Sequence, residues 1–87
     1  MPKMTKPLLA KLAKLEAVKE FETQNIYAAA APRNDIRFND CYAMANPVIR
    51  TCYDAAVRDL EAFRQEMINQ GRGYRCDSFG HFTPNWR

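Results

Sequence analysis

The sequence predicts an all-α fold: an antiparallel helical hairpin with a short connecting helix and a non-helical aromatic C-terminal tail. Two long segments repeat apolar residues at three- and four-residue spacing, which is typical of amphipathic helices. Turn-forming residues separate these segments, and the end of the chain changes to aromatic, Gly and polar residues. The chain has 87 residues, which is enough for one domain.

The first segment, residues 1–31, is predicted to be a basic N-terminal helix. Thr5 is a suitable N-cap and Pro7 fits the first turn of a helix over residues 5–24. The alanine-rich residues that follow can extend this helix up to Pro32. The buried face is expected to contain Leu8, Leu12, Leu15 and Val18 or Lys19, with Phe21 and Ile26 continuing its edge.

The second segment, residues 32–46, is predicted to be a loop followed by a short helix. Its first part is rich in turn-forming residues, and we expect Ile36 and Phe38 to reach from this loop into the core. Asp40 is the expected cap of a helix over residues 41–45.

The third segment, residues 47–70, is predicted to be a long amphipathic helix, capped by Asn46, started by Pro47 and ended by Gly71. The spacing predicts a continuous apolar stripe, widened by neighbouring residues. Its members are Ile49, Tyr53, Ala56, Leu60, Phe63 and Met67, and the neighbours are Val48, Cys52 and Val57. The same stripe could instead form the seam of an antiparallel homodimer through this helix.

The last segment, residues 71–87, is an aromatic tail. It carries flat amphipathic residue types that are enriched at binding hot spots. Two interpretations stay open: these residues cover the helical hairpin, or they dock on a partner protein, with Trp86 the ring best suited to docking. The predicted partner-binding residues are Arg72, Tyr74, Arg75, Phe79, Phe82, Trp86 and Arg87.

No motif in the sequence predicts a metal site, a cofactor or a catalytic centre. Cys41, Cys52, Cys76 and His81 are possible zinc ligands, but their spacing contains no Cys-x-x-Cys pair. His81 follows Asp77 and Ser78 within five residues, whereas a catalytic triad converges from separate elements. We therefore expect a protein that is not an enzyme, with no cofactor and no metal.

Charge is unevenly distributed along the chain. Residues 1–19 carry five Lys against one Glu, residues 20–70 carry five Arg against eight acids, and residues 71–87 carry three Arg against one Asp. Lys11 and Lys14 are possible nucleic-acid contacts, although the mild net charge of +3 makes that role the less favoured one.

The odd number of cysteines, three, favours free thiols and a cytoplasmic location, and no apolar run approaches the roughly 20 residues of a membrane span. The favoured function is a small accessory or inhibitory factor that occupies a surface of a larger host protein. Such factors are typical of phages and mobile elements, and their targets include nucleases and defence complexes. The alternatives are a structural subunit of a large assembly and a nucleic-acid-binding protein that uses the basic ends.

Overall fold

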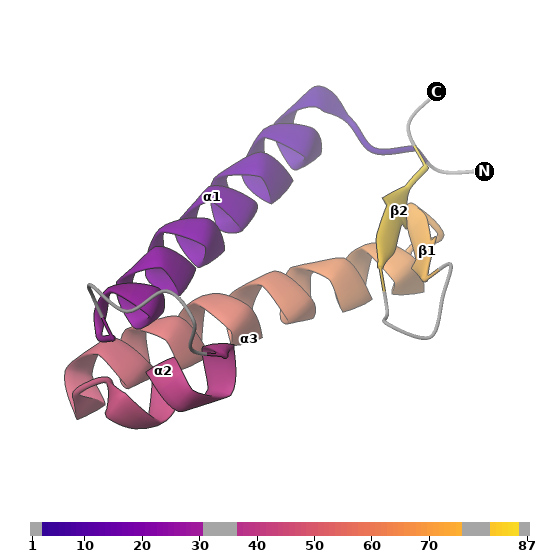
Figure 1. Cartoon of the computed structure of the whole chain (residues 1–87). Helices are drawn as coiled ribbons and strands as arrows, with labels where there is room; N and C mark the ends of the chain where they lie inside the picture. The colour runs from indigo at the N-terminus through magenta and orange to yellow at the C-terminus, as the bar shows by residue number, and fades with distance from the viewer. Residues whose placement is uncertain (1–2, 31–36, 76–80, 86–87) are drawn as a thin grey trace.

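Two long helices form the arms of a V in the computed structural model, and a small β-hairpin lies at its open end (Figure 1). The structure describes residues 3–30, 37–75 and 81–85. The predicted mostly helical fold, with a long helix pair and a short connecting helix, is confirmed. The elements are α1 (Lys6–Ala28), α2 (Phe38–Met44), α3 (Pro47–Asn69), β1 (Gly73–Arg75) and β2 (Phe82–Pro84).

Helix α1 begins as predicted, with the Leu8 N–H donating to Thr5 Oγ1 at 3.4 Å and proline in the first turn. It continues to Ala28, which confirms the extension allowed by the alanine-rich residues. Ile26 is fully buried, but Phe21 is 63% exposed, so the prediction that Phe21 continues the buried edge is wrong. Phe21 lies nine positions after the buried Leu12, which is half a turn away on a helix.

Helix α2 begins at Phe38, earlier than predicted, so Asp40 lies in the first turn instead of capping the helix. The Phe38 ring packs 5.5 Å from Tyr27 and 5.1 Å from Tyr53, between ring centroids, which fixes the start of α2 against both long helices. Phe38 therefore reaches the core as expected, and Ile36 lies outside the described residues.

Helix α3 has the two ends that its sequence predicts. At the start, the Ile49 N–H donates to Asn46 Oδ1 at 3.0 Å, and proline follows the cap. At the end, Gly71 has a positive φ of 76°, and its N–H donates to the Ile68 carbonyl at 2.9 Å. The Arg72 N–H donates to the Met67 carbonyl at 2.7 Å, which completes a Schellman motif.

The apolar stripe of α3 is buried over its centre and C-terminal half, at Ala56, Leu60, Phe63 and Met67. The predicted widening of this stripe is wrong at two positions, because Val48 is 71% exposed and Cys52 is also exposed. Both lie near the start of α3, on a side of the helix that no other described element covers, while Val57 is half-buried.

The non-helical tail contains a two-stranded antiparallel sheet that sequence analysis did not predict. Strand β1 pairs with β2 so that Tyr74 lies opposite Thr83 and Arg75 opposite Phe82. The hairpin is tied to the start of the chain because the Met4 N–H donates to the Asn85 carbonyl at 2.7 Å. The two ends of the described chain therefore meet at the open end of the V (Figure 1).

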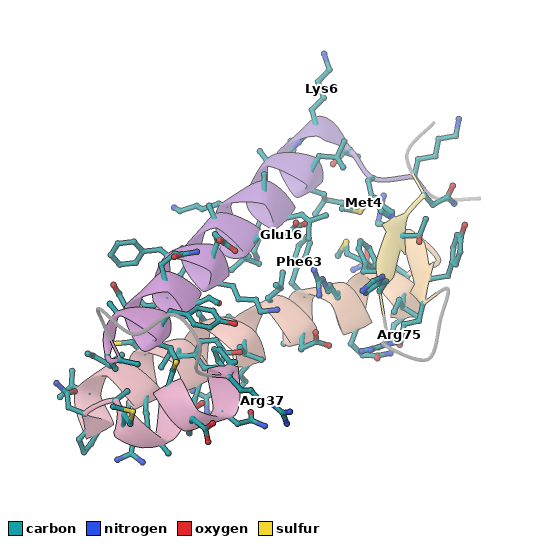
Figure 2. The ribbon with its side chains drawn as sticks, viewed as in Figure 1. Met4, Lys6, Glu16, Arg37, Phe63 and Arg75 are labelled. Atoms are coloured by element: carbon teal, nitrogen blue, oxygen red, sulfur yellow. The ribbon has the colours of Figure 1, made fainter. Side chains whose placement is uncertain are left out.

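The core consists of two hydrophobic clusters. The hairpin-end cluster contains Met4, Leu12, Leu60, Phe63 and Met67, with Leu8, Leu9, Leu15 and Phe82 packed against it. The α2-end cluster contains Ile26, Ala30, Cys41 and Ala45, with Phe38, Tyr42, Ile49 and Tyr53 among its neighbours. Met4 and Phe63 both lie between the two arms of the V (Figure 2).

Candidate partner-binding surface

The hairpin has an inner face against the helices and an outer face toward solvent. Side chains alternate between the faces of a strand, so Tyr74 and its partner Thr83 share one face, and Arg75 and Phe82 share the other. Phe82 packs against the hairpin-end cluster, which identifies its face as the inner one. Tyr74 is therefore on the outer face, and it is 55% exposed.

Close packing of Phe82 explains the glycine at position 73. A Cβ atom added to Gly73 would lie 2.2 Å from Phe82 Cε2 and 3.1 Å from the Thr83 carbonyl oxygen. Both distances are shorter than a van der Waals contact, so any side chain at this position would displace the Phe82 ring. Glycine at this position thus lets the aromatic ring of one strand cover the backbone of the other.

The two arginines of the described tail hold the hairpin in place. Arg72 donates from Nε to Gln70 Oε1 at 2.7 Å and from Nη1 to the Lys3 carbonyl, which joins the end of α3 to the start of the chain. Arg75 Nη2 lies 3.1 Å from Glu61 Oε2 on α3. These contacts orient the hairpin on the helices, although exposed ion pairs of this kind add little stability.

The predicted partner-binding residues that the structure describes therefore separate into three groups. Phe82 and Arg72 make contacts within the chain, Arg75 pairs with α3 at the hairpin edge, and Tyr74 is presented to solvent. The remaining predicted residues, Phe79, Trp86 and Arg87, lie outside the described residues.

A groove of about 620 Å³ runs between α1 and α3 near the hairpin, and sequence analysis did not identify it. Leu8, Leu15, Phe63 and Met67 contribute its apolar surface, whereas Asp59 and Glu66 lie on its α3 side and Lys11 on its α1 side. The groove exists because the two helices diverge toward the hairpin, and that divergence has no signal in the spacing of apolar residues.

The two lysines proposed for nucleic-acid contact both lie on α1, and one of them, Lys11, lines this groove. Lys11 Nζ lies 5.4 Å from the centroid of the Phe63 ring, within the range of a cation–π contact. Lys14 is exposed one turn further along and borders a separate apolar depression with Val18. The acidic side chains across the groove limit how far this surface could attract a phosphate backbone.

A hydrogen-bonded group of two tyrosines and an aspartate joins α2 and α3 at the α2 end of the molecule. The Tyr42 hydroxyl donates to both carboxylate oxygens of Asp54, at 2.8 and 3.0 Å. This hydrogen bond, together with desolvation, raises the pKa of Tyr42, because it favours the neutral phenol. Burial, with the nearby Asp54 charge, raises the pKa of Tyr53. Both pKa shifts favour the neutral phenol, and a neutral Tyr42 on α2 keeps the proton that it donates to Asp54 on α3. This arrangement is therefore suited to joining α2 and α3.

Two of the possible zinc ligands, Cys41 and Cys52, differ in burial and lie on different helices. Cys41 is a buried free thiol in the α2-end cluster and Cys52 is an exposed free thiol on α3, while Cys76 lies outside the described residues. Within residues 3–30, 37–75 and 81–85, no three His, Cys, Asp or Glu side chains gather as metal ligands would. His81 is exposed beside β2.

No protein-family model, curated protein or solved structure matches this chain. In the part of the chain that the structure describes, no helix combines the length and the apolar content that crossing a membrane requires.

Proposed function

We propose that this chain is a small non-enzymatic accessory or inhibitory factor that binds a larger protein through the outer face of its hairpin. The observation that carries this proposal is Tyr74, more than half exposed on a strand whose other face is packed on the core. Aromatic side chains held in this way give large contact area at a small cost in conformational entropy.

Several contacts support a preorganised binding surface. The hairpin is fixed to the helices by Phe82, by the Arg75–Glu61 ion pair and by the backbone bond from Met4 to Asn85. A partner that binds Tyr74 therefore does not need to order the hairpin first, and that entropic cost is absent from the binding free energy.

The test is affinity capture of a partner from nuclease-treated host lysate, followed by measurement of its affinity for single variants. We expect Tyr74→Ala to weaken binding by about 2 kcal/mol, roughly 30-fold, while leaving the circular dichroism melt unchanged. Met44→Ala is the matched control, because Met44 is also 55% exposed but lies on α2, at the other end of the molecule. Equal affinities for wild type and Tyr74→Ala would refute the proposed surface.

A further inference from the structure

Helix α1 carries a second line of residues beside the one that it buries. Lys11, Leu15, Val18 and Glu22 follow spacings of four, three and four, and Leu8 precedes them by three. This is the spacing of a coiled-coil seam. Val18 is 43% exposed, Lys11 is also exposed, and the other three are half-buried. The apolar residues of α1 are consequently spread around the helix, whereas those of α3 gather on one side.

This second line borders open surface from Leu8 to Val18. Leu8, Lys11 and Leu15 form the α1 side of the groove next to α3, and Lys11, Leu15 and Val18 border a second apolar depression with Ala10. The apolar stripe of α3 is already covered by α1 and the hairpin within the same chain. Among the described helices, the one that leaves a seam exposed is therefore α1.

The overall dimensions indicate that the chain leaves an unusual amount of surface open. Its radius of gyration is 15.2 Å, against about 12 Å for a compact domain of this length. Its accessible surface is 6235 Å², against about 5,300 Å² for a monomer of its mass.

The charges along the seam identify the occupant. The charged residues of the seam are Lys11, toward its N-terminal end, and Glu22, at its C-terminal end, with Leu15 and Val18 between them. A second copy running antiparallel places Lys11 against Glu22 of the other copy, and Leu15 against Val18. The residue numbers in each pair sum to 33, which means that one antiparallel register places both pairs opposite each other. The same register brings Leu8 against Asn25.

We propose that two copies of this chain associate through the Leu8–Glu22 face of α1, antiparallel about a two-fold axis between Leu15 and Val18. The interface is isologous, so each copy supplies the same lysine and the same glutamate and two ion pairs flank the apolar centre. Lys11 also lies over the Phe63 ring, and its long side chain keeps this contact while its ammonium group reaches the second copy. This surface is separate from Tyr74, so the proposal is independent of partner binding by the hairpin.

The experiment is sedimentation equilibrium of the full chain, with a charge swap that tests the register. Wild type should self-associate as a dimer. Lys11→Glu and Glu22→Lys should each weaken dimerisation about tenfold or more, because each places two like-charge pairs in the interface. The double variant Lys11→Glu with Glu22→Lys should recover the wild-type dissociation constant.

Control variants separate the register from a general effect of charge. Lys6→Glu with Glu20→Lys changes the same residue types on exposed α1 positions outside the seam and should leave dimerisation unchanged. Val18→Asp should dissociate the dimer and, because Val18 is partly exposed, retain the helical circular dichroism spectrum. A wild-type chain that stays monomeric, or a double swap that dimerises no better than the single variants, would overturn the proposal.

Discussion

Removing the Phe82 ring tests whether the C-terminal hairpin is part of the core. Truncating a fully buried phenylalanine costs about 3–5 kcal/mol, and Phe82 is half-buried against the hairpin-end cluster, so Phe82→Ala should cost about 2 kcal/mol. A chain of 87 residues has a total stability of about 4–13 kcal/mol, so this loss is a substantial fraction of it.

Urea unfolding followed by far-ultraviolet circular dichroism measures this change. With a denaturant dependence of about 1 kcal/mol per molar urea, the midpoint should fall by about 2 M. Tyr74→Ala, on the outer face of the same hairpin, should stay within about 0.5 kcal/mol of wild type. The variants are compared at one protein concentration because the self-association proposed above would add to apparent stability. A Phe82→Ala midpoint equal to that of wild type would refute the assignment of an inner face to the hairpin.

Three other substitutions test single contacts. Gly73→Ala should lower the urea midpoint by the equivalent of about 1–3 kcal/mol because the new methyl group collides with Phe82, and an unchanged midpoint would contradict the packing. Asn46→Ala should cost about 1 kcal/mol through the lost α3 cap, and no loss on urea unfolding would show that the cap is not formed. Asp54→Asn should lower the raised pKa of Tyr42 in an absorbance titration of the phenol. A titration of Asp54→Asn identical to that of wild type would refute the hydrogen bond. The contribution of Tyr42 to stability is complete below the ordinary phenol pKa of about 10, and it is lost as pH rises through the raised pKa of the folded state.

Helix positions could be predicted from the sequence where local chemistry determines them. Thr5 and Asn46 are good caps because a side-chain oxygen accepts a backbone N–H from within the first turn, and both do so in the structure. Gly71 ends α3 because it adopts a positive φ at no steric cost. These interactions involve residues within three positions of each other, so the sequence contains the whole signal.

Burial was harder to predict where it depends on the angle between helices. Phe21 and Val48 are apolar and lie near predicted stripes, yet both are exposed, because no other described element covers their sides of α1 and α3. The start of α2 was missed for a related reason. Phe38 is brought into the helix by contacts with Tyr27 and Tyr53, which are distant in sequence.

The tail could be predicted as non-helical but not as a hairpin. Its strands have three residues each, too short for a period-two pattern to be recognised. Their pairing depends on Phe82 covering Gly73 and on the link from Met4 to Asn85 at the other end of the chain. Of the predicted binding residues, Tyr74 is distinguished from Phe82 only by the register of this pairing, which the sequence did not provide.

Because the core has two clusters, we expect the local stability of the two ends of the molecule to depend on the hairpin to different extents. The hairpin-end cluster needs Met4 and Phe82, which come from opposite ends of the chain, whereas the α2-end cluster is built from residues 26–53. In native-state hydrogen exchange, Phe82→Ala should therefore lower amide protection around Met67 by more than it does around Cys41. Leu60 belongs to the hairpin-end cluster and lies on the helix that runs through both, so Leu60→Ala should lower protection at both ends. An equal loss at Met67 and Cys41 in Phe82→Ala would show instead that the two clusters open as a single cooperative unit.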